Sequence, residues 1–159
     1  MKILVISDTH GYIGPAQNAI MNNPGVDLVI HLGDNWRDAP KLSLMFPNVQ
    51  FECIRGNCDF ASNNVPDERL LELGGKRVFI THGHRYAVKK DYGRLYRRAL
   101  ELNADLVLFG HTHTADIVEM EKCCMVNPGS TSDPRSRSPR SCAVIEIENG
   151  RISPRIVGL

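Results

Sequence analysis

Short apolar runs recur along the chain, separated by stretches with a helical hydrophobic period. The runs are rich in Val, Ile, Leu and Phe, and most do not alternate with polar residues; they cover residues 3–6, 26–32, 49–54, 78–80 and 106–109. An uninterrupted run of this length is typical of a strand that is covered on both faces. Helices are expected between the runs, at residues 13–22, 36–46 and 88–102. This alternation predicts an α/β fold with a mainly parallel sheet in the first half of the chain.

The pattern changes after His113. Short strands are expected at residues 116–121, 123–126, 143–148 and 151–157, without helices between them. Asn149-Gly150 between the last two is a strong hairpin signal. These strands predict an antiparallel portion or a second sheet packed on the first. Residues 130–141 are rich in Ser, Arg and Pro and are expected to form an exposed loop.

Length and charge limit the possible functions. A chain of 159 residues predicts a single domain, here taken as residues 1–159. The net charge of +1 argues against a general binder of nucleic acids or membrane surfaces. There is no Cys-x-x-Cys pair among the five cysteines, no secretory signal and no apolar run near the ~20 residues that span a bilayer. We expect a soluble cytoplasmic protein with reduced thiols.

Polar side chains directly follow all five apolar runs of the first part of the chain. The segments are Ser7-Asp8-Thr9-His10, Gly33-Asp34-Asn35, Arg55-Gly56-Asn57-Cys58-Asp59, Thr81-His82-Gly83-His84 and Gly110-His111-Thr112-His113. In open α/β sheets, ligands bind beyond the carboxyl ends of the strands. The last segment is the most specific, because two His residues two positions apart can face one point only on an irregular loop.

Each segment alone has a simpler explanation. Asp8-Thr9 could cap the next helix, and Gly33-Asp34 and Gly56-Asn57 could be turns. His82 could be a hydrogen-bonded side chain at a strand end. The ordered recurrence of such segments at successive strand ends favours a shared site instead. His and Asp are common ligands of Zn, Mn, Fe and Ni, and so many donors suit two ions about 3.5–4 Å apart, which can clamp a phosphoryl group.

Taken together, these segments resemble the motifs of the calcineurin-like metallophosphoesterase superfamily, and most closely its small phosphodiesterases of the YfcE group. Asn127-Pro128-Gly129-Ser130 is similar to a further stretch of that group. The resemblance covers residues 1 to about 148 and implies a two-sheet αββα sandwich. It also implies two sets of metal ligands. One metal would take Asp8, His10, Asp34 and His113, and the other Asp34, Asn57, His82 and His111, with Asp34 bridging. His84 corresponds to a position beside the site.

The resemblance implies a dinuclear metal-dependent phosphodiesterase that acts on a small phosphoester substrate through a metal-bridging hydroxide. The expected ions are two divalent cations, Mn first, with Ni, Fe, Zn or Co as alternatives. We expect no stable nucleic-acid complex and no membrane partner, while a homodimer or higher homo-oligomer stays open. A phosphomonoesterase with the same site and a Vps29-like non-enzymatic scaffold are the alternatives. A DNA nuclease is disfavoured, because no basic excess is present to hold a duplex.

Asp34, Asn57 and Cys58 are the candidate catalytic residues. Many members of the superfamily carry His directly after the motif Asn, where it is thought to help protonate the leaving group; here Cys58 stands in that place. A thiol is a poorer acid than imidazolium at neutral pH, so we expect a preference for good leaving groups or a different acid. Cys58 as a simple packing residue stays open.

Two further groups of residues are less specific. His31 lies inside an apolar run and is expected to be a hydrogen-bonded core residue rather than a ligand. Arg135, Arg137 and Arg140 are expected in a solvated loop, although they could reach a second phosphate or an anionic leaving group.

Overall fold

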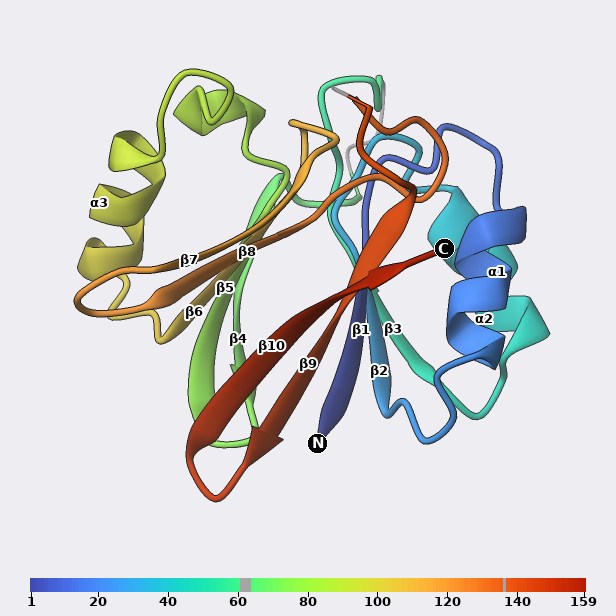
Figure 1. Ribbon diagram of the computed structural model, residues 1–159, viewed down its shortest axis with the longest axis horizontal. Coiled ribbons are helices and arrows are strands. Elements are labelled where there is room, and N and C mark those ends of the chain that lie inside the picture. The colour runs from blue at the N-terminus through green and yellow to red at the C-terminus, as the bar shows by residue number, and fades with distance from the viewer. Residues whose placement is uncertain (61–63, 136) are drawn as a thin grey trace.

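Two β-sheets pack face to face, and helices cover the outer face of each (Figure 1). The computed structural model describes residues 1–60, 64–135 and 137–159. Its elements in chain order are β1 Lys2–Ile6, α1 Gly14–Met21, β2 Leu28–His31, α2 Asp38–Met45, β3 Gln50–Cys53, β4 Glu68–Leu73, β5 Lys76–Thr81, the short 3₁₀ helix η1 His84–Tyr86, α3 Gly93–Glu101, β6 Leu106–Phe109, β7 Ala115–Glu119, β8 Cys124–Pro128, β9 Ser141–Glu148 and β10 Arg151–Gly158.

Each sheet has a parallel centre and antiparallel edges. The first sheet has the order β10-β9-β1-β2-β3, in which β1, β2 and β3 are parallel and β9 runs antiparallel to β1. The second has the order β4-β5-β6-β8-β7, in which β5, β6 and β8 are parallel and β4 and β7 run antiparallel at the edges. The ends of β1, β2, β3, β5 and β6 therefore face the same rim, at the top of Figure 1.

Three apolar clusters hold these layers together. The central cluster lies between the sheets, with Ile3 and Val5 of one sheet and Ile80 and Leu108 of the other fully buried. The second lies under α1 and α2 on the outer face of the first sheet, and the third lies under α3 on the outer face of the second. The two-sheet α/β sandwich expected from the family resemblance is confirmed.

The sheet assignment from hydrophobic pattern was incomplete. The five apolar runs do not share one sheet: β1, β2 and β3 lie in the first and β5 and β6 in the second. The edge strand β4 was not predicted, because its sequence, Glu-Arg-Leu-Leu-Glu-Leu, contains no uninterrupted apolar run. The hairpin at Asn149-Gly150 is present between β9 and β10, and both residues have positive φ, as a type I′ turn requires.

Two expected segments differ from the structure. The helix expected at residues 88–102 begins only at Gly93, whose N–H is held by Asp91 Oδ1, while Val88 is buried before it. The loop at residues 130–141 is not exposed throughout: Ser130, Thr131 and Ser141 are buried, and Ser136 lies outside the described residues. None of the described helices has the length and apolar character needed to cross a bilayer.

Candidate metal centre

Backbone hydrogen bonds bring the strand ends of both sheets together at one rim. The Asp8 N–H donates to the Gly33 carbonyl at 3.1 Å, which joins the loops after β1 and β2. The Gly110 N–H donates to the His82 carbonyl at 3.1 Å, which joins the loops after β6 and β5. The Cys58 N–H donates to Asp34 Oδ1 at 2.9 Å and brings in the loop after β3. The His111 N–H donates to Asp8 Oδ2 at 3.3 Å and joins the loops of the two sheets, so all five polar segments predicted from the sequence meet.

The backbone at this rim adopts a rare conformation. Five of the predicted ligand residues have positive φ: Asp8 at 55°, His10 at 46°, Asp34 at 56°, His111 at 71° and His113 at 60°. Non-glycine residues seldom occupy this left-handed region, and such strain gathers at functional sites. The left-handed conformation lets side chains two positions apart, such as His111 and His113, converge on one side of an irregular loop.

Two glycines allow the close approach of the loops after β2 and β3. A Cβ on Gly56 would overlap Asp34 Oδ1 and the Asp34 backbone nitrogen. Gly33 has a φ of +94°, and a Cβ there would overlap the backbone of Arg55 and Gly56. The place of the Asp34 carboxylate thus depends on the absence of a side chain at position 56.

The first predicted ligand set forms a compact cluster. Asp8, His10, Asp34 and His113 each offer one donor atom, and these atoms lie within 4.8 Å of one another. His113 Nε2 lies 3.2 Å from Asp8 Oδ1, and His10 Nε2 lies 3.9 Å from Asp34 Oδ2. Residues more than 100 positions apart in the sequence are therefore neighbours here.

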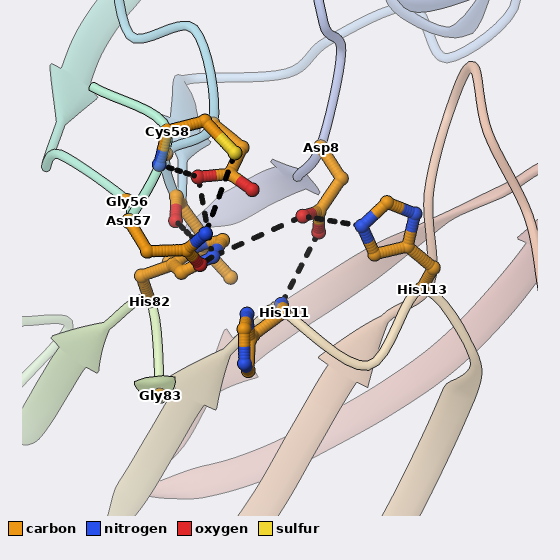
Figure 2. A network of polar contacts seen from close by, with 12 residues as sticks. Asp8, Gly56, Asn57, Cys58, His82, Gly83, His111 and His113 are labelled. Carbon is orange, nitrogen blue, oxygen red and sulfur yellow. Dashed lines mark hydrogen bonds and ion pairs between the residues drawn. The ribbon is translucent and has the colours of Figure 1, made fainter. Parts of the chain in front are cut away.

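The second predicted set gathers around His82 (Figure 2). His82 Nε2 lies 3.4 Å from Asp34 Oδ1 and 3.1 Å from Asn57 Oδ1. The ring of His111 lies 5.1 Å from the ring of His82, measured between centroids. Asp34 therefore turns one oxygen toward His10 and the other toward His82, so its carboxylate lies between the two sets.

Outer hydrogen bonds fix the orientation of two imidazoles. His82 Nδ1 donates to the Leu32 carbonyl at 2.8 Å, and His113 Nδ1 donates to the Asp133 carbonyl at 2.5 Å. With Nδ1 used as a donor, each neutral ring presents the lone pair of Nε2 to the site. The sequence did not indicate the part played by Asp133, since it acts through its backbone.

The carboxylates and imidazoles of the site shift one another's pKa values. Burial alone would raise the pKa of the Asp34 carboxyl, but when no cation is bound a proton on His82 Nε2 supplies a hydrogen bond and a positive charge that outweigh burial and lower that pKa. For Asp8, too, burial would raise the pKa, and His113 and His82 lower it overall. Burial, followed by the charge of His82, lowers the pKa of His111 to about 4, so its ring stays neutral and able to donate a lone pair.

The surroundings of one buried oxygen, Asp8 Oδ1, indicate that a cation fits this site. Asp8 Oδ1 is buried and accepts no hydrogen bond of good geometry from the described residues. It faces His113 Nε2 at 3.2 Å and His82 Nε2 at 4.0 Å, and both rings already donate through Nδ1. Acceptor atoms thus converge without a donor between them, an arrangement that costs free energy unless a proton or a cation lies there. The donor set of carboxylates, imidazoles and an amide oxygen suits divalent transition metals.

His84 and Cys58 lie beside these clusters. The His84 ring centroid is 5.5 Å from that of His82, and its buried Nδ1 has no hydrogen-bond partner among the described residues. Cys58 is exposed, and its Sγ accepts a hydrogen bond from Asn57 Nδ2 at 3.3 Å. Partial desolvation, followed by the Asp34 carboxylate, raises the pKa of the Cys58 thiol to about 11.

A buried polar chain supports the two ligand loops from below. His31 Nδ1 accepts the Gly33 N–H at 3.1 Å, so His31 Nε2 carries the proton and donates to Thr9 Oγ1 at 2.9 Å. The Thr9 hydroxyl donates in turn to Asp38 Oδ2 at 2.7 Å. His31 is thus a hydrogen-bonded core residue rather than part of the cluster. The sequence did not indicate the role of Asp38.

The loop after β8 contributes a second support that the sequence did not specify. The hydroxyls of Ser130 and Ser132 both donate to the Asp8 carbonyl at 2.8 Å. Asn127 Nδ2 donates to the Gly110 carbonyl at 2.9 Å and so holds the loop that carries His111. The only sequence signal for this support was the Asn127-Pro128-Gly129-Ser130 stretch.

Comparison with known families gives a match over most of the chain. Residues 1–150 match the family model described as the calcineurin-like phosphoesterase superfamily domain. The chain is similar to the probable metallophosphoesterase YsnB of Bacillus subtilis, with 38% identity over 98% of this chain and 89% of that protein. It is also similar to the phosphodiesterase YfcE of Escherichia coli, with 27% identity over 92% of this chain and 88% of that protein.

Solved structures share the fold. A predicted phosphoesterase from Streptococcus pneumoniae superposes with a TM-score of 0.83 and 28% identity, over 99% of this chain and 88% of that one. Vps29 from Entamoeba histolytica superposes with a TM-score of 0.79 and 19% identity, over 99% of both chains. At 19% identity, the similarity to Vps29 shows a shared fold and nothing more.

Proposed function

This chain belongs to the calcineurin-like phosphoesterase superfamily and is a metal-dependent phosphoesterase, and from that premise we propose that it is a dinuclear phosphodiesterase of small phosphodiesters. The relatives include a protein named as a phosphodiesterase, which favours diesters over monoesters as the substrate class. The net charge of +1 agrees with a small substrate rather than a long nucleic acid.

The position of the Asp34 carboxylate is the observation that supports two ions best. Its Oδ2 lies 3.9 Å from His10 Nε2, and its Oδ1 lies 3.4 Å from His82 Nε2. One carboxylate with an oxygen toward each ligand set is suited to bridge two cations. In this proposal Asp8, His10 and His113 complete the first position. Asn57, His82 and His111 complete the second.

Two divalent ions at such a site lower the pKa of bound water and neutralise charge that develops on a phosphoryl group. The chain's own residues supply the remaining functions. His82 and His113 keep Nε2 directed at the site because Leu32 and Asp133 hold the opposite nitrogen. Asn57 contributes a neutral oxygen and lies at the exposed edge of the site, where a substrate can enter.

Metal content and hydrolysis test the proposal together. Metal-stripped protein is reloaded with Mn, Ni, Fe, Zn or Co singly, and bound ions are counted by elemental analysis. We expect two ions per chain and hydrolysis of bis(p-nitrophenyl) phosphate in preference to p-nitrophenyl phosphate. Asp34→Asn, which removes the shared carboxylate, is expected to lose both ions and activity, whereas His111→Gln is expected to retain one ion.

Other results would identify an alternative function. Preference for the monoester would make the chain a phosphomonoesterase with the same residues. A stoichiometry of one ion in the wild-type protein would contradict the dinuclear site. A chain that binds ions but hydrolyses neither ester would favour a scaffold similar to Vps29.

A further inference from the structure

A polar cavity of about 660 Å³ lies between α1, the end of β10 and the loop before β9. Figure 1 shows α1 next to the C-terminal end of β10, on the outer face of the first sheet. Its volume is in the range of small-molecule sites. It shares no residue with the predicted ligand sets, although Tyr12 at its edge follows His10 by two positions.

Two arginines contribute positive charge to this cavity. Arg140 and Arg155 both line it, and within the described parts of the chain neither forms an ion pair. No Asp or Glu is among the described lining residues. Residues 11–26, which include all of α1, contain no charged side chain, although 23% of the whole chain is charged. A pair of guanidinium groups in a concave site favours an anion, and phosphate in particular.

Arg140 is held in place before any ligand arrives. Its Nε donates to the Ser132 carbonyl at 3.2 Å, and its guanidinium carbon lies 5.4 Å from the Tyr12 ring centroid. Its own carbonyl accepts the Leu159 N–H at 2.9 Å. A guanidinium anchored in this way loses little conformational freedom on binding, which favours affinity.

The opposite wall offers uncharged hydrogen-bonding groups. Gln17, Asn18 and Asn22 line the cavity from α1 and the residue after it, and their side-chain amides form no hydrogen bond with other described residues. Asn18 and Asn22 are four positions apart, so they lie on the same side of the helix. Free amides can pair with hydroxyl groups, which both donate and accept.

We propose that this cavity binds a phosphorylated, polyhydroxylated small molecule of the sugar-phosphate class, with the phosphate between Arg140 and Arg155 and the hydroxyls on the α1 amides. This site is separate from the metal centre and goes beyond the proposed hydrolysis. Its ligand is recognised by charge at one end and by neutral polar groups at the other.

Binding of ribose 5-phosphate to the Zn-loaded full chain tests the proposal by NMR. We expect shifts of the side-chain amide resonances of Asn18 and Asn22, and weaker or no shifts with ribose. Arg155→Gln is expected to weaken binding about tenfold or more, because it removes a charge-assisted hydrogen bond to the phosphate. Arg151→Gln removes the same charge from the same strand outside the cavity and is the matched control, expected to bind as the wild type does.

Three results would overturn the proposed sugar-phosphate site. They are NMR shifts confined to residues around Asp34, equal affinity of Arg155→Gln and wild type for ribose 5-phosphate, and equal affinity of the wild type for inorganic phosphate and ribose 5-phosphate. Hydrolysis of bis(p-nitrophenyl) phosphate is expected to be the same in Arg155→Gln and wild type. A loss of binding with unchanged hydrolysis therefore separates this site from the metal centre.

Discussion

The Thr9 hydroxyl donates a 2.7 Å hydrogen bond to Asp38 Oδ2 and so joins the loop after β1 to the first turn of α2. The same oxygen accepts the Gly11 N–H at 2.9 Å and Asn35 Nδ2 at 3.0 Å. Asp38 is fully buried, and these three donors belong to the two loops that carry Asp8, His10 and Asp34. One carboxylate outside the ligand sets therefore fixes the relative position of both loops.

Replacing Asp38 by Ala is expected to weaken metal binding without removing a ligand. Residues that orient ligands typically contribute about 10–100-fold to metal affinity, and three donors would be left without an acceptor. Calorimetric titration of the stripped protein with Mn or Zn measures the loss. Lys41→Ala is the control, because among the described residues Lys41 pairs only with the other oxygen of Asp38, and its side chain is more than half exposed. Equal affinities for the two variants would show that the hydrogen bonds of Asp38 do not position the ligands.

Gly56→Ala is expected to displace Asp34. The added methyl group would overlap Asp34 Oδ1 and the Asp34 backbone nitrogen. The φ angle at position 56 is not in the left-handed region, so alanine causes this overlap but no backbone strain. We expect metal affinity to fall at least tenfold. We also expect the thermal midpoint to fall by several degrees, because overpacking lowers the free energy of unfolding by about 1–3 kcal/mol.

Gly158→Ala is the matched variant for this test. Nothing lies within 4 Å of a Cβ at position 158, and its φ is also outside the left-handed region. Its metal affinity and midpoint should equal those of the wild type. A Gly56→Ala protein with unchanged metal affinity would mean that Asp34 need not occupy its observed position.

The convergence of the predicted ligands could be anticipated because parallel strands end at a common rim. Asp8, His82 and His111 directly follow apolar runs, and this placement is visible in the sequence. Their backbone conformations are not visible there: His111 and His113 have positive φ although neither is glycine, and their loop is held by tertiary hydrogen bonds such as that from Asn127 to the Gly110 carbonyl. The division of the apolar runs between two sheets was also hidden, since β2 of the first sheet and β6 of the second are both short, fully buried strands.

Residues that support the site through burial were the hardest to predict. Ser130 and Asp38 are polar, and polarity alone places them at the surface. Both are fully buried because each satisfies backbone or hydroxyl groups of a distant loop. The edge strand β4 was missed for the opposite reason: charged residues interrupt its leucines, so it lacks the apolar run that marked the central strands.

Cys58→His is expected to reduce the dependence of the rate on the leaving group. The Cys58 thiol, with its pKa raised to about 11, is a weak proton donor near neutral pH, whereas an imidazolium is a better one. The slope of log kcat/KM against leaving-group pKa, measured over a series of aryl and alkyl phosphodiesters, should become shallower in the variant. Cys58→Ser serves as the control and should keep the steep slope. Parallel slopes for wild type and Cys58→His would mean that Cys58 only packs beside Asn57.

His31 is expected to make folding stability depend on pH between about 4 and 6.5. Burial lowers the pKa of His31 to about 4, and its Nδ1 cannot take a proton without opposing the Gly33 N–H. As pH falls through 6.5, the unfolded chain binds a proton at this residue and the folded chain does not, so the free energy of unfolding decreases until pH reaches about 4. The total loss is about 3 kcal/mol, at about 1.4 kcal/mol for each pKa unit.

Urea unfolding with EDTA present, at pH values from 4 to 7.5, measures this effect without a contribution from metal binding. His31→Leu removes the titrating ring, and although it is less stable at pH 7 because Thr9 loses a donor, its stability should fall less steeply with decreasing pH than that of the wild type. His84→Leu is the comparison variant, since His84 is only half-buried and its ring forms no hydrogen bond with the described residues. If wild type and His31→Leu lost stability equally from pH 6.5 to 4, the proton would be entering the folded chain elsewhere, and the tautomer assigned to His31 from the Gly33 contact would be wrong.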